Sequence, residues 1–166
     1  WRDDPSQIVE QYLKWADSYK ENQIVLVYDT MWNSTRKMAE AIATGIRMQD
    51  PGVTVKLMNA AKDDKSDVIT EVFRSKAVLV GSSTINNRFL HAIGGILEMI
   101  RGLKFKGKSA AAFGSYGWSG EAVGLISKLL EESGFTLLNS GLKVQWVPDD
   151  AATAKCVEYG KSIAAG

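Results

Sequence analysis

The sequence predicts an α/β protein with a doubly wound parallel sheet and helices on both faces. Short apolar runs typical of buried strands alternate along the chain with longer runs whose apolar residues recur at helical spacing. Strands that alternate with helices form parallel sheets, because each helix carries the chain back to where the next strand begins. The chain has 166 residues, enough for one domain with a full core.

The strand regions differ in their patterns. The first and third are almost wholly apolar, as strands covered on both faces are, whereas the second alternates apolar and polar residues and suits a place nearer the sheet edge. We expect the five strands at residues 24–28, 53–58, 77–81, 109–113 and 135–146, the last interrupted near 139–141.

Five amphipathic runs fill the spaces between and after these strands. We expect helices at residues 34–49, 68–74, 89–100, 121–133 and about 150–163. On the last helix, Ala154 and Val157 are expected to face the core, and Cys156 is interpreted as a small core residue and not a reactive thiol. His91 is interpreted as a solvated helix residue.

Residues 1–22 differ from the rest of the chain. Pro5 and Ser6 precede an aromatic-rich helical run, and no start-like segment comes before it. One interpretation is a linker or helix from a preceding domain, with the folded domain covering residues 23–166. The other is an ordinary amphipathic first helix that packs on the domain.

Composition excludes several classes of function. A net charge of +1 gives no strong field for nucleic acid or a membrane surface. One histidine and one cysteine cannot form the ligand cluster of a typical transition-metal site or an internal disulfide. We therefore expect a cytoplasmic protein whose chemistry belongs to a bound cofactor, with no catalytic residue and no metal ligand of its own.

Three loops carry the functional signal, because they follow the first, third and fourth strands and so leave from the same carboxyl edge of the sheet. In such sheets ligands bind at this edge. The loops are rich in hydroxyl, amide, glycine or aromatic residues, and they read T-M-W-N-S-T at 30–35, S-S-T-I-N-N at 82–87 and G-S-Y-G-W-S-G at 114–120.

The first loop suits a phosphate. A helix begins there, and its first amides and its macrodipole attract an anion that the hydroxyls of Thr30, Ser34 and Thr35 can also bind. A second interpretation stays open, in which Ser34 or Thr35 only caps the helix.

The other two loops suit an aromatic ring. Asn86 and Asn87 offer amides for the edge of a ring, and Tyr116 and Trp118 offer flat faces, with Trp32 converging from the first loop. A phosphate-bearing aromatic ligand fits all three loops, and flavin mononucleotide (FMN) is the candidate. The chain has no Walker motif, and its glycines lack the spacing of the dinucleotide fingerprint.

The same loops carry a family resemblance. Residues 28–39 (Y-D-T-M-W-N-S-T-R-K-M-A), 80–87 (V-G-S-S-T-I-N-N) and 113–120 (F-G-S-Y-G-W-S-G) resemble, in this order, the flavodoxin-like domain of the flavo-diiron proteins, the A-type flavoprotein or flavorubredoxin family. The resemblance runs from about residue 23 to the end, and W-R-D-D-P at 1–5 is similar to that family's linker from its metal domain.

This resemblance implies a flavodoxin-like sheet of five parallel strands in the order 2-1-3-4-5. It also implies that the first loop holds the FMN phosphate and that the other two flank the ring. The implied FMN-binding residues are Thr30, Met31, Trp32, Asn33, Ser34, Thr35, Ser83, Thr84, Ile85, Asn86, Asn87, Ser115, Tyr116, Gly117, Trp118 and Gly120.

The resemblance further implies an electron-relay module. FMN would pass electrons to a diiron site that reduces oxygen or nitric oxide, in a lactamase-like domain absent from this chain. The implied partners are that domain, reached in trans within a head-to-tail homodimer, and a rubredoxin or a reductase as electron donor. Two alternatives stay open: a free-standing FMN-dependent NAD(P)H oxidoreductase or quinone reductase, and a flavodoxin-like module that has lost its ligand.

Overall fold

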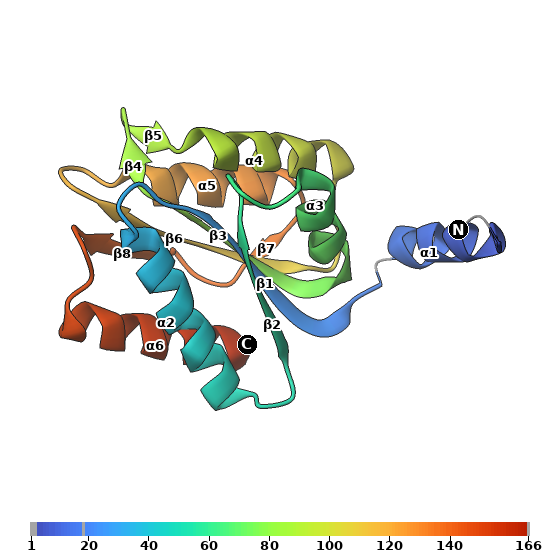
Figure 1. Ribbon diagram of the computed structural model, residues 1–166, viewed down its shortest axis with the longest axis horizontal. Helices are drawn as coiled ribbons and strands as arrows, with labels where there is room; N and C mark the ends of the chain where they lie inside the picture. Colours follow the sequence, from blue (N-terminus) through green and yellow to red (C-terminus); the bar gives the residue numbers. More distant parts are fainter. Residues whose placement is uncertain (1–2, 18, 166) are drawn as a thin grey trace.

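One parallel sheet forms the centre of the computed structural model, which describes residues 3–17 and 19–165. The strand order is β2-β1-β3-β6, and β7 and β8 both pair with the outer side of β6 (Figure 1), so the predicted order is confirmed. The strands are β1 (Glu21–Asp29), β2 (Thr54–Asn59), β3 (Ser75–Ser82), β6 (Ser109–Tyr116), β7 (Thr136–Leu137) and β8 (Leu142–Gln145).

The apolar strands are central, as their sequences predict. β1 lies between β2 and β3 with Val27 level with Met58 on one side and Val80 on the other. The fifth strand region is divided in two, also as predicted, because the chain leaves β6 after Leu137 and returns to it at Leu142. Gly141, with a left-handed φ of 88°, lies in the turn that leads back to β6.

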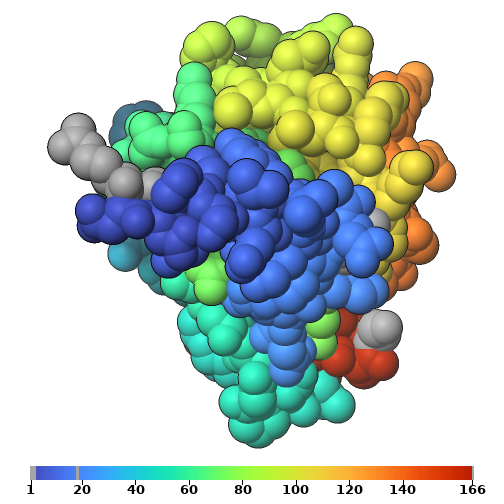
Figure 2. Space-filling view, turned by 90° about the vertical axis from the view of Figure 1, so that its right-hand side faces the viewer, coloured from blue at the N-terminus to red at the C-terminus, as the bar shows by residue number. Residues whose placement is uncertain are grey.

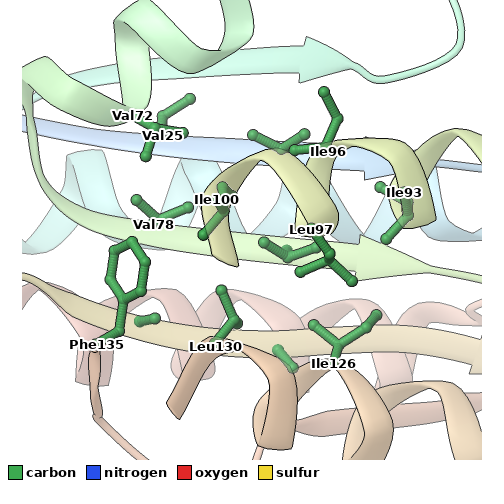
Figure 3. Close-up of a cluster of buried hydrophobic side chains, with 14 of the residues drawn as sticks. Val25, Val72, Val78, Ile93, Ile96, Leu97, Ile100, Ile126, Leu130 and Phe135 are labelled. Atoms are coloured by element: carbon green, nitrogen blue, oxygen red, sulfur yellow. The ribbon is translucent and has the colours of Figure 1, made fainter. Parts of the chain in front are cut away.

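Helices cover both faces of the sheet. α2 (Ser34–Gln49) and α6 (Asp150–Ala165) pack together on one face, and α3 (Lys65–Arg74), α4 (His91–Leu103) and α5 (Glu121–Glu132) cover the other (Figure 1). Figure 3 shows the core between the sheet and this second group of helices, which includes Val78 of β3, Ile96 of α4 and Ile126 of α5. In the described ranges, no helix is both long and apolar enough to cross a membrane.

Three expectations about helices are wrong. The helix predicted from residue 68 begins at Lys65, because the Asp64 side chain caps it by accepting from the amides of Ser66 and Asp67. The helix predicted from residue 89 begins at His91, because Arg88–Phe89 form β5, which pairs antiparallel with β4 (Thr84–Ile85) in a small hairpin. On α6, Ala154 is exposed instead of facing the core. The interpretation of Cys156 is confirmed: it is fully buried, and burial raises the pKa of its thiol to about 11.

The N-terminal helix, α1 (Ser6–Ala16), extends from the amino end of the sheet (Figure 1), and Figure 2 shows it in blue on that end of the molecule. None of its residues is buried, and the apolar side chains of Val9, Tyr12 and Leu13 are exposed. In an ordinary amphipathic first helix, such side chains would be buried against the domain. The contact of α1 with the domain includes the Trp15 ring, which stacks on Phe73 at 4.9 Å. Trp1 and Arg2 of the predicted linker motif lie outside the described residues.

Candidate functional site

The three predicted loops lie together where β1, β3 and β6 end (Figure 1). The register of the sheet explains this, because Tyr28 of β1 is level with Gly81 of β3, which is level with Phe113 of β6. The loops therefore leave the sheet within a few residues of the same height, and their side chains can meet.

Four buried hydroxyl groups join the loops at this edge. The Oγ atom of Ser115 lies 2.8 Å from Ser34 Oγ, 3.0 Å from Thr35 Oγ1 and 3.1 Å from Ser83 Oγ. Thr35 Oγ1 and Ser83 Oγ are 2.9 Å apart. All four side chains are buried. We call these residues the hydroxyl cluster; Ser115, from the third loop, is its centre.

The start of α2 has the character of an anion site. The residue at the cap position of the helix is Asn33, in the left-handed conformation at φ 60°, and its side chain makes no capping hydrogen bond. The interpretation of Ser34 or Thr35 as the helix cap is therefore wrong. Among the described residues, the buried Oγ1 atom of Thr30 has no hydrogen-bond partner. A buried hydroxyl without a partner at a helix start favours a ligand that accepts hydrogen bonds.

A cavity of about 390 Å³ opens above the hydroxyl cluster. Ser34, Ser83, Thr84 and Ser115 line its polar part, and apolar and aromatic side chains line most of the rest. The exposed fractions of Trp32 and Trp118 are 81% and 88%, which is unusual for tryptophan and leaves both indoles free to contact a ligand. The apolar and aromatic lining consists of Met31, Trp32, Tyr116, Trp118, Trp146 and Val147.

The second loop forms the β4–β5 hairpin. Asn86 and Asn87 are its two turn residues, with positive φ angles of 48° and 59°. Positive φ at both central residues is what a type I′ hairpin turn requires, and asparagine tolerates it. This gives the asparagines a local structural role, and both are exposed on the hairpin and outside the lining of the cavity.

Glycines let the third loop approach its neighbours. A Cβ on Gly114 would lie 2.2 Å from the Ser82 carbonyl oxygen, so only glycine fits between β3 and β6 there. Gly120, at φ 73°, precedes α5 and lies against the Tyr116 ring. At the start of α5 the Ser119 hydroxyl donates to the Glu121 carboxylate over 2.9 Å, which lowers the pKa of that carboxyl.

A fourth loop, after β8, was missed by the sequence reasoning. It brings Trp146 and Val147 to the same cavity, with the Trp146 ring edge-to-face against Trp118 at 5.5 Å. The signal that could have found them is topological: the fifth strand region ends at the same edge of a parallel sheet as the others.

The structure brings together most of the predicted site residues. Those that line the cavity are Met31, Trp32, Ser34, Ser83, Thr84, Ser115, Tyr116, Gly117 and Trp118. Thr35 belongs to the hydroxyl cluster, Thr30 and Asn33 line a neighbouring cavity of about 460 Å³, and Gly120 precedes α5. Ile85, Asn86 and Asn87 lie on the hairpin, outside the lining.

The chemistry of the lining favours binding over acid–base catalysis. Within the described ranges, Tyr116 is the one ionisable side chain that lines the cavity. Hydroxyl donors at one part and indole rings at the other suit a ligand with an anionic group and a flat aromatic group.

Comparison with known proteins agrees with this geometry. The flavodoxin family model matches residues 26–160. The chain is 54% identical over 164 residues to the anaerobic nitric oxide reductase flavorubredoxin of Aeromonas salmonicida, covering 99% of this chain and 31% of that protein. It thus spans about a third of the length of the curated relatives it matches.

Two solved structures show the same fold. Rubredoxin oxygen:oxidoreductase from Desulfovibrio gigas superposes with a TM-score of 0.88 at 36% identity, over 96% of this chain and 39% of that one. A flavodoxin from the domain Archaea superposes with a TM-score of 0.75 at 31% identity, over 86% of this chain and 96% of that one.

Proposed function

The chain belongs to the flavodoxin family, and from this premise we propose that it is an FMN-binding electron-transfer domain. The observation that carries the proposal is the convergence of buried hydroxyls and exposed tryptophans from separate loops on one cavity. When bound, FMN supplies the capacity to accept electrons and pass them on. The residues of the chain bind and orient it.

The residues present fit this cofactor. The orphaned Thr30 hydroxyl and the uncapped start of α2 suit the phosphate, and the hydroxyl cluster adds donors beside them. We assign Ser83 and Ser115 to the phosphate, because their hydroxyls bond to those of Ser34 and Thr35. The family resemblance, in contrast, implies that both residues flank the ring.

The exposed indoles suit the ring. Trp32 and Trp118 line the apolar part of the cavity, where stacking on a flat ring would remove their faces from water. The other predicted site residues, including Ile85, Asn86 and Asn87 on the exposed hairpin, remain proposals.

We propose further that the domain relays electrons to a diiron site in a lactamase-like domain of the same protein, which reduces nitric oxide or oxygen. The names of the relatives support this acceptor, and a rubredoxin or a reductase would be the donor. The exposed apolar side of α1 supports the proposal that residues 1–22 include a helix that packs on another domain, ahead of the folded domain predicted at 23–166; β1, the first strand of that domain, already begins at Glu21. A head-to-tail homodimer would bring the exposed tryptophans of one subunit to the acceptor of the other.

The proposal is tested by purifying the chain, denaturing it and identifying any flavin released by chromatography. We expect a yellow protein that releases FMN. A colourless protein that takes up no FMN would contradict the proposal.

Addition of NAD(P)H under anaerobic conditions distinguishes a relay from a free-standing oxidoreductase. We expect the flavin absorbance to persist, because a relay domain receives electrons from a protein donor. Rapid bleaching by NAD(P)H alone would favour the oxidoreductase.

A further inference from the structure

Trp146 has an unusual backbone conformation. Its φ is 60°, in the left-handed region that disfavours residues with a bulky side chain. The other positive-φ residues among those described are asparagines, glycines and Lys104, so Trp146 is the one aromatic residue of the set. Strained conformations persist only where the surroundings hold them, and they gather at binding sites.

The third loop holds this conformation in place. The Trp146 amide donates to the Tyr116 carbonyl oxygen over 2.7 Å. The side chain of the preceding residue, Gln145, donates to the Gly117 carbonyl oxygen over 3.1 Å. Both bonds fix Trp146 to the loop that carries Trp118.

The result is an indole directed at the cavity and not into the core. The exposed fraction of Trp146 is 57%, and its ring lies edge-to-face with Trp118 at 5.5 Å and 71°. A Cβ on Gly117 would lie only 3.0 Å from the same ring, so the close approach depends on glycine there. Core packing does not account for a strained tryptophan that is more than half exposed.

We propose that Trp146 is a further binding residue of this site, which contacts the flat ring of the ligand beside Trp118. The inference rests on the proposed function for the identity of the ligand. It adds the loop after β8 to the loops after β1, β3 and β6 as a wall of the site.

The test uses two variants that separate the ring from the backbone. Trp146→Ala and Trp146→Gly both remove the indole, but only glycine adopts a left-handed φ without strain. We expect both variants to bind FMN and riboflavin about 10-fold more weakly, the loss typical of one aromatic stacking contact. Riboflavin lacks the phosphate, so an equal loss for both ligands places the contact at the ring.

Three further measurements complete the test. The glycine variant should unfold at a higher temperature than the alanine variant, because it relieves the strain. Trp146→Phe should restore most of the affinity, because it restores an aromatic face. Trp15→Ala, which removes a tryptophan stacked on Phe73 at the opposite end of the sheet, should leave flavin affinity unchanged.

Several outcomes would overturn the inference. If Trp146→Gly binds both flavins as tightly as the unaltered chain, only the backbone matters and the ring makes no contact. Loss of FMN binding with riboflavin binding unchanged would place Trp146 at the phosphate instead. If the unaltered, folded chain binds neither flavin, the proposed function itself fails and this inference fails with it.

Discussion

Replacing Ser115 by alanine tests the assignment of the hydroxyl cluster to the phosphate. The Ser115 hydroxyl is buried and within 3.1 Å of three other hydroxyls, two of them at the start of α2. A hydrogen bond to a charged group contributes about 1.5–3 kcal/mol, so its loss should weaken FMN binding roughly 10- to 150-fold. Riboflavin has no phosphate, and its affinity should change by less than about twofold.

The assay is a parallel titration of FMN and riboflavin into the flavin-free chain, followed by quenching of flavin fluorescence. Ser119→Ala is the matched control, because Ser119 belongs to the same loop but its hydroxyl bonds to Glu121 outside the cluster. Ser115→Ala should also lower the free energy of unfolding by about 1–2 kcal/mol, since the buried Ser34 hydroxyl loses its partner. Equal weakening of both flavins, or no change in either, would refute the assignment.

Three other predictions concern the fold. Gly114→Ala should lower the free energy of unfolding by roughly 3 kcal/mol, because its Cβ would meet the Ser82 carbonyl oxygen at 2.2 Å. The control Gly124→Ala has open space at its Cβ and should raise the free energy of unfolding, measured with urea, by up to about 1 kcal/mol. A Gly114→Ala variant more stable than Gly124→Ala would be inconsistent with the packing. Burial raises the pKa of the Cys156 thiol from 9.0 to about 11, which leaves about 100-fold less thiolate at pH 8. A thiol reagent should therefore label Cys156 far more slowly in the native chain than in the unfolded chain. Equal labelling rates would contradict the burial of Cys156. Lys108→Met should lower the free energy of unfolding by about 3 kcal/mol, because the Lys108 ammonium donates to the carbonyl oxygens of Tyr19, Phe73 and Ser75. Thermal and urea unfolding measure this loss, and an unchanged midpoint would count against those hydrogen bonds.

The parts of the fold that could be predicted are those with a long periodic signal. The helix at 34–49 has the expected bounds, because its apolar residues recur over four turns and a turn at Pro51-Gly52 follows it. The central place of β1 and β3 follows from their composition, since wholly apolar strands are typical of a sheet that is covered on both faces, whereas the strand order comes from the family resemblance.

The β4–β5 hairpin could not be predicted, because each of its strands has two residues and no periodicity. Phe89 continues the apolar spacing of the following helix, so the pattern assigns it there, whereas its backbone pairs with Thr84. Asn-Asn is also a weaker turn signal than Asn-Gly.

The candidate site was predictable in place but not in detail. Parallel topology brings the three loops to one edge, but the meeting of four hydroxyls within about 3 Å depends on the register of β1, β3 and β6. Trp146 gives no local sign in the sequence, because neither a left-handed φ nor a bond to Tyr116 can be inferred from residue types.

The measurement that tests the central claim most directly is a calorimetric titration of FMN into the folded, flavin-free chain. We predict one FMN bound per chain, with a shifted flavin absorption band and quenched tryptophan fluorescence, since Trp32, Trp118 and Trp146 line the cavity. No heat of binding and an unchanged flavin spectrum, in a chain that circular dichroism shows to be folded, would contradict the account.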